Sequence, residues 1–180
     1  MLNFDQRDAL LKVARESIEA AAKDKSYAPP NTDDPELCRP AAVFVTLNKS
    51  GRLRGCIGTV EPGDPLIEAV AKMARASALE DPRFPPVRPI EVSQLVIDIS
   101  VLTPAERVKD VNNIEIGKHG LIIQDGHCRG LLLPQVASEW GWTCEEFLDH
   151  CCIKAGLPEG HWRKGGEIYS FTAEVFGEEE

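Results

Sequence analysis

The hexapeptide LRGCIG at residues 53–58 places the guanidinium of Arg54 and the thiol of Cys56 two residues apart. The pattern is typical of a β-strand, on which successive side chains point to opposite faces. We predict that Leu53 and Ile57 face the core, and that Arg54 and Cys56 project together from the other face. A guanidinium close to a thiol favours the thiolate, which is the nucleophilic form of cysteine. The spacing therefore predicts a catalytic Cys56 and an Arg54 that binds an anionic group of a substrate.

Gly55 and Gly58 flank the cysteine and carry no side chain. Their lack of bulk would let a ligand approach the backbone, so both are predicted to take part in substrate binding. The alternative is that a helix also covers this face. Cys56 would then be a small buried apolar residue and Arg54 a member of an ion pair. The residues alone leave both interpretations open.

A histidine between glycines, His119 in the segment GKHG at 117–120, is the second candidate for catalysis. A neutral imidazole in a loop can act as a general base toward a thiol or a substrate. Lys118 beside it would help to bind the substrate. The alternative is that His119 only makes local hydrogen bonds, as many loop histidines do.

The segment EDPRF at 80–84 joins acids to an arginine and an aromatic residue at the expected end of a helix. Asp81 precedes a proline and can fix a turn, and Arg83 can pair with it. The same two side chains could instead orient a ligand at the rim of a cleft, so Asp81 and Arg83 are candidate binding residues.

The composition is that of a soluble globular protein, with 43% apolar and 27% charged residues among 180. This length suits one domain over residues 1–180, with room for two subdomains. A net charge of -9 argues against general binding of nucleic acid. The apolar stretches are too short to span a bilayer, and the N-terminus lacks the basic and apolar regions of a signal peptide. We therefore expect a cytoplasmic protein that does not contact membranes.

Six cysteines occur without any CxxC pair, the spacing that usually announces a zinc site. We expect no metal site and no bound cofactor, and free thiols in a reducing compartment.

Helical and strand-like segments follow one another without a regular βαβ alternation. Periodicity and turn residues predict the following elements: helices over about 5–24, 65–79, 134–140 and 144–155, hairpins over 41–60 and 120–133, and strands over 95–102 and 167–176. Hairpins mixed with helices predict an α+β fold, with a largely antiparallel sheet flanked by helices.

Five motifs together resemble the AMMECR1 domain family, whose bacterial and archaeal members are also called system protein A of the AmmeMemoRadiSam group. They are LRGCIG, DPRF at 81–84, ISVLTP at 99–104, IGKHGL at 116–121 and LLLPQVA at 131–137. The resemblance implies two unequal lobes with a cleft between them, around which the motif residues gather. It also implies a pathway shared with a Memo-type, dioxygenase-like protein and a radical SAM enzyme.

The residues and the resemblance leave two main functions open. In the first, the protein binds or converts a small molecule in the cleft, with Cys56 as nucleophile or thiolate ligand, Arg54 as anion binder and His119 as proton carrier. In the second, LRGCIG is a rigid docking edge of a non-catalytic scaffold for a partner protein. A factor in transcription, translation or repair is the least favoured, because the chain is acidic.

Overall fold

The computed structural model describes residues 1–178, which divide into two compact units. Unit 1 comprises residues 1–101 together with the C-terminal segment that starts at Glu174, and unit 2 comprises residues 102–173. Each unit has its own four-stranded sheet and its own apolar core. The predicted α+β fold, with antiparallel strands flanked by helices, is confirmed. Across residues 1–178, no helix combines the length and the apolarity needed to cross a membrane.

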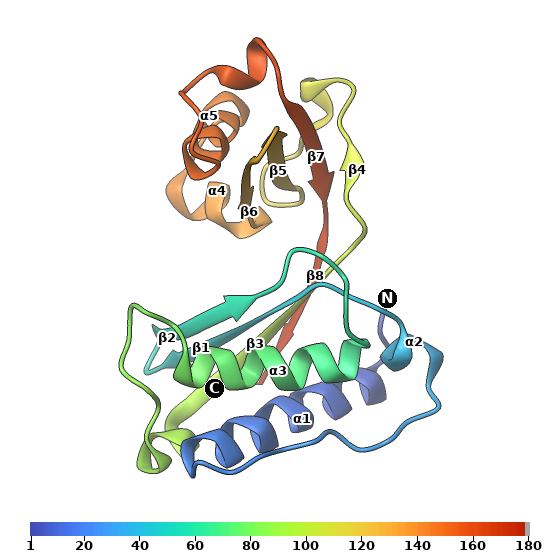
Figure 1. The fold of residues 1–180 in the computed structure, drawn as a ribbon, viewed down its shortest axis with the longest axis vertical. Coiled ribbons are helices and arrows are strands. Elements are labelled where there is room, and N and C mark those ends of the chain that lie inside the picture. Colours follow the sequence, from blue (N-terminus) through green and yellow to red (C-terminus); the bar gives the residue numbers. More distant parts are fainter. Residues whose placement is uncertain (179–180) are drawn as a thin grey trace. The chain divides into compact units, whose positions relative to one another are not determined.

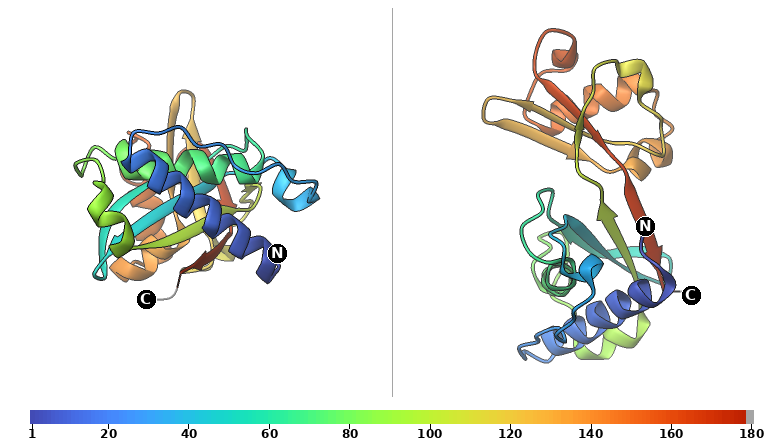
Figure 2. Two further views of the ribbon diagram at one scale, coloured as in Figure 1. Left: turned by 90° about the horizontal axis from the view of Figure 1, so that it is seen from below. Right: turned by 90° about the vertical axis from the view of Figure 1, so that its right-hand side faces the viewer.

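The sheet of unit 1 has the strand order β2-β1-β3-β8, so β2 is an edge strand. Two long helices lie together on one side of this sheet (Figures 1 and 2). The elements of unit 1 are α1 (Phe4–Ala22), α2 (Pro35–Cys38), β1 (Val43–Lys49), β2 (Arg52–Gly58), α3 (Leu66–Leu79), η1 (Pro89–Gln94), β3 (Leu95–Leu102) and β8 (Ala173–Gly177).

Burial alternates along β1 from Val43 to Leu47 and identifies the two faces of this sheet. Val43, Val45 and Leu47 are fully buried in the core that α1 and α3 cover. Thr46 lies between them on the chain, and its side chain therefore points away from the two helices. This alternation decides which side chains of β2 and β3 share a face with Thr46.

The sheet of unit 2 has the order β4-β7-β5-β6, and α5 packs against β5 and β6 (Figure 1). Its elements are β4 (Glu106–Arg107), η2 (Val111–Asn113), β5 (Gly120–Asp125), β6 (Cys128–Leu132), α4 (Pro134–Trp140), α5 (Cys144–Lys154), η3 (His161–Arg163) and β7 (Glu167–Phe171). The predicted capping box of α5 is confirmed, because Thr143 accepts from the Glu146 N–H and Glu146 accepts from the Thr143 N–H.

The prediction of one continuous final strand was wrong. The segment breaks at Thr172 into β7, which belongs to the sheet of unit 2, and β8, which belongs to the sheet of unit 1. At the break, the Thr172 N–H donates to Thr103 Oγ1, and the Thr103 N–H donates to the carbonyl of Thr172. Both threonines lie near the ends of the segment that forms unit 2, and the Thr103 hydroxyl accepts the Thr172 N–H at the point where the β7 ladder ends.

Candidate functional site

Cys56 lies in the second half of β2, directly opposite Thr46 on β1. Because the two residues face each other across an antiparallel pair, their side chains share the face that points away from α1 and α3. The Thr46 hydroxyl donates a hydrogen bond to Cys56 Sγ over 3.3 Å. The thiol is partly exposed. Cys56 is therefore neither buried in the core nor free of polar contacts.

The predicted pairing of Arg54 with Cys56 on one face was wrong, because β2 contains a β-bulge. Gly55 is opposite Leu47 and Leu53 is opposite Asn48, which leaves Arg54 without a partner on β1. The extra residue breaks the alternation of faces. Leu53, predicted to lie in the core, is 41% exposed.

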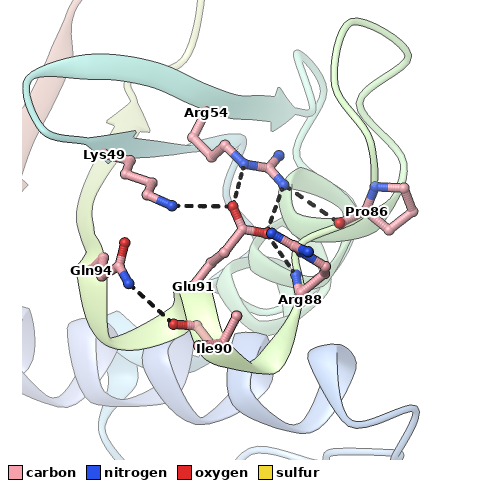
Figure 3. Close-up of polar contacts among 7 residues, drawn as sticks. All are labelled: Lys49, Arg54, Pro86, Arg88, Ile90, Glu91 and Gln94. Atoms are coloured by element: carbon pink, nitrogen blue, oxygen red, sulfur yellow. Dashed lines mark hydrogen bonds and ion pairs between the residues drawn. The ribbon is translucent and has the colours of Figure 1, made fainter.

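The bulge sends the Arg54 side chain to the carboxylate of Glu91, which lies on η1 (Figure 3). Arg54 Nε and Nη2 each lie 3.4 Å from an oxygen of Glu91, and Nη2 also donates to the carbonyl of Pro86. Arg54 is thus a member of an ion pair, as the structural alternative predicted.

The guanidinium that accompanies Cys56 belongs instead to Arg83, in the loop that follows α3. Arg83 Nη2 donates to the carbonyl of Cys56 over 3.4 Å and to Asp81 Oδ2 over 2.7 Å. The hydrogen bonds from Arg83 hold the pKa of the Asp81 carboxyl well below its usual range. The pKa of Arg83 is raised, chiefly by its hydrogen bond to Asp81 and to a smaller degree by charge on Cys56.

Asp81 is almost fully buried, at 4% exposed, and closes the outer edge of β2 at the cysteine. Its Oδ2 accepts the Cys56 N–H at 2.9 Å, and its Oδ1 accepts both the N–H and Nε of Arg83 at 3.0 Å. The predicted pairing of Asp81 with Arg83 is confirmed. The backbone groups of Cys56 that an edge strand would expose are therefore bonded within unit 1, which protects this edge from pairing with another strand.

The two glycines of the motif make room for neighbouring parts of unit 1. A Cβ at Gly55 would lie 2.2 Å from the carbonyl oxygen of Ser77 on α3, and a Cβ at Gly58 would lie 2.3 Å from the Phe44 ring. The Ser77 hydroxyl also accepts from the Ile57 N–H and donates to a carbonyl of β1. The space predicted for a ligand at these positions is thus taken up by α3 and Phe44. The role of Gly55 and Gly58 in substrate binding stays a prediction.

Lys118 and His119 belong to unit 2, and their observed contacts are local. The Glu115 N–H donates to His119 Nδ1 over 3.0 Å, and Lys118 Nζ lies 2.7 Å from the Glu115 carboxylate. This ion pair lowers the pKa of Glu115. An accepting Nδ1 places the proton of a neutral imidazole on Nε2. The catalytic role predicted for His119 and the binding role predicted for Lys118 stay predictions.

Histidine, cysteine, aspartate and glutamate side chains do not form a metal-binding group of three or more anywhere in the described part of the chain. All six cysteines are free thiols, and Cys151 and Cys152 are fully buried in the core of unit 2. Burial raises the pKa of Cys151 to about 12. The cysteines that can react with a ligand are therefore those that reach solvent, which include Cys56 and Cys38.

Sequence reasoning missed Thr46, Ser77 and Glu91, which contact LRGCIG from three different elements. Thr46 could have been found, because it is the polar residue of an otherwise apolar run, FVTL. Ser77 and Glu91 carry no comparable signal, since a serine in a helix and a glutamate near a proline are common.

Comparisons of this chain with known proteins all point to the same protein family. A family model described as AMMECR1 matches residues 11–176, which include parts of both units. Protein PH0010 of Pyrococcus horikoshii is 47% identical, and the alignment covers 94% of this chain and 88% of that protein. A protein of Methanothermobacter thermautotrophicus is 44% identical, with 99% and 97% covered. The crystal structure of PH0010, titled an uncharacterized protein, superposes with a TM-score of 0.88 over 94% of this chain and 90% of that one.

Proposed function

This chain belongs to the AMMECR1 family, and from that premise we propose that it binds a small molecule beside Cys56, whose thiol is the reactive group. The observation that carries this proposal is the Arg83 guanidinium, which the buried Asp81 carboxylate fixes against the backbone of Cys56. Asp81 sets the position of this cation through two of its nitrogens, Nε and Nη2. A positive charge in a fixed place beside a partly exposed thiol is the environment in which reactive cysteines occur.

Each side chain of the site has a proposed role. The thiolate is the attacking form of cysteine, and both a guanidinium and a hydroxyl donor stabilise an anionic sulfur. Thr46 supplies the hydroxyl, which donates to Cys56 Sγ, and Arg83 supplies the guanidinium, which is bonded to the Cys56 carbonyl. The Arg83 side chain is 55% exposed, so part of it can also contact a bound ligand. Asp81 acts through Arg83 and serves to position it.

The reactivity of Cys56 can be tested against a second thiol of the same unit. We expect iodoacetamide to alkylate Cys56 about tenfold faster than Cys38 near neutral pH, although Cys38 is the more exposed. Peptide mapping by mass spectrometry measures both rates in the unmodified protein. Arg83→Gln and Thr46→Val should each slow the alkylation of Cys56 several-fold and leave Cys38 unchanged, because they remove the cation and the hydroxyl donor.

Arg52→Gln is the matched control, since it removes an exposed cation from the same strand. It should not change the rate at Cys56. Alkylation of Cys56 that is slower than that of Cys38, and that becomes fast only in urea, would identify a structural cysteine and overturn the proposal.

The alternative function is a scaffold that docks a partner protein. Leu53, 41% exposed beside the bulge, would supply one apolar contact to such a partner. The Memo-type and radical SAM proteins implied by the family resemblance are the partners to test in purified form. Binding that is lost in Leu53→Ser and Arg54→Ala but kept in Cys56→Ser would favour the scaffold. Binding unaffected by these changes would exclude LRGCIG as the docking site. The interlobe cleft stays a prediction in either case.

A further inference from the structure

Three cations surround the single carboxylate of Glu91 on the helix side of the unit 1 sheet (Figure 3). Lys49 comes from the end of β1, Arg54 from the bulge of β2 and Arg88 from the residue before η1. We call these four residues the Glu91 cluster. It carries an excess of about two positive charges in a chain whose net charge is -9.

None of the three cations makes a short ion pair with Glu91. The nitrogen–oxygen distances are 3.3 Å for Lys49, 3.4 Å for Arg54 and 3.5 Å for Arg88, whereas strong charge-assisted hydrogen bonds measure about 2.7–2.9 Å. The closest contact of the carboxylate is the Arg88 N–H, at 3.1 Å. The pKa of Glu91 is lowered to about 2, first by this backbone hydrogen bond and then by Arg54. Much of the hydrogen-bonding capacity of the three cations is therefore unused.

The cluster also reaches from the interior to the surface. Glu91 and Arg54 have side chains only 11% and 13% exposed, whereas Lys49 is 31% and Arg88 is 75% exposed. An anion arriving from solvent would meet Arg88 first and could then approach Arg54. Two forked guanidinium groups and one ammonium group suit an anion that has several acceptor oxygens.

We propose that the Glu91 cluster binds a phosphate group, either as inorganic phosphate or as the monoester of a small molecule. A phosphate monoester carries about -1.5 to -2 charges near neutral pH, which matches the excess of the cluster, whereas a single carboxylate carries half as much. This site is separate from the one at Cys56, because the bulge places the Arg54 and Cys56 side chains on opposite faces of β2. If the Glu91 cluster does not bind phosphate, the proposed function of Cys56 is not affected.

Isothermal titration of the whole protein with inorganic phosphate at low ionic strength, about 20 mM, tests the proposal. We expect saturable binding that Arg88→Gln weakens about five- to tenfold. Arg88 is largely exposed, so this change should leave the fold intact. Glu91→Gln should strengthen binding, because it removes the carboxylate that competes with the ligand. Circular dichroism of each variant verifies that it is folded.

Arg52→Gln removes one positive charge from the same strand without removing a member of the cluster, and should change the affinity less than twofold. If Arg52→Gln and Arg88→Gln weaken phosphate binding equally, the affinity depends only on the overall charge of the protein. This result would overturn the proposal. So would the absence of saturable binding. Phenyl phosphate distinguishes the two forms of the ligand. An affinity like that of phosphate assigns the site to monoesters, and exclusion of phenyl phosphate assigns it to inorganic phosphate.

Discussion

Gly55→Ala is expected to lower the free energy of unfolding of unit 1 by about 3 kcal/mol. The added Cβ would lie 2.2 Å from the Ser77 carbonyl oxygen and 3.2 Å from its carbonyl carbon. Both atoms are backbone of α3, so a side-chain rotation cannot relieve the contact. The helix must move away from β2, which also pulls the Ser77 hydroxyl from the Ile57 N–H. Alanine also restricts the unfolded chain more than glycine does, and this offsets less than about 1 kcal/mol of the loss.

Urea unfolding followed by circular dichroism measures this loss. All three tryptophans, Trp140, Trp142 and Trp162, lie in unit 2, so their fluorescence provides a parallel record of that unit. Gly63→Ala is the control, because a Cβ there would meet nothing within 4 Å. It should change stability by less than about 0.5 kcal/mol. A Gly55→Ala protein as stable as the Gly63→Ala protein would contradict the close packing of α3 on β2.

Asp81→Asn is expected to cost about 2–3 kcal/mol of stability near neutral pH. The carboxylate accepts from the Cys56 N–H and from the N–H and guanidinium of Arg83. A neutral amide has one acceptor oxygen and would leave some of these donors without a partner. The cost stays in this range because Arg83 is 55% exposed and can turn to water after the change.

The loss of stability caused by Asp81→Asn should become smaller as the pH falls. The pKa of Asp81 is lowered in the folded protein, first by the hydrogen bond from Arg83. A lowered pKa means that the unfolded chain takes up a proton before the folded protein does. The stability that Asp81 contributes is then complete above the unfolded pKa of about 3.9 and is lost as the pH falls further.

Urea unfolding at about pH 7 and at about pH 3 therefore gives a difference between wild type and Asp81→Asn that shrinks at the lower pH. Asp33→Asn changes an exposed carboxylate and should show no such difference. A difference that stays constant down to pH 3 would mean that a neutral Asp81 stabilises the fold as well as the carboxylate does. The proposed positioning of Arg83 by charge would then be wrong. Loss of Asp81 should also slow the alkylation of Cys56, since it releases Arg83.

The elements of the fold follow closely from local patterns in the sequence. Alternating apolar residues and turn glycines predict the two hairpins, the strand at 95–102 is predicted with its observed bounds, and Thr143 and Glu146 predict the start of α5. Each of these features depends on residues a few positions apart, which interact within one helix turn or one hairpin. The break at Thr172 was not predicted, because EIYSFTAEVF has strand character throughout and the exchange between sheets depends on distant partners.

The sequence by itself determined the chemistry available near LRGCIG: a thiol, nearby arginines, and glycines where close packing is required. It also determined the family, because the five motifs occur in order along the chain. Only the tertiary structure decided which arginine accompanies the thiol. The face that a strand residue occupies depends on its register with the neighbouring strand, and one bulge at Arg54 reverses that face. Arg83 reaches Cys56 because the end of α3 lies beside an edge strand, a contact between residues 27 positions apart that no local pattern records.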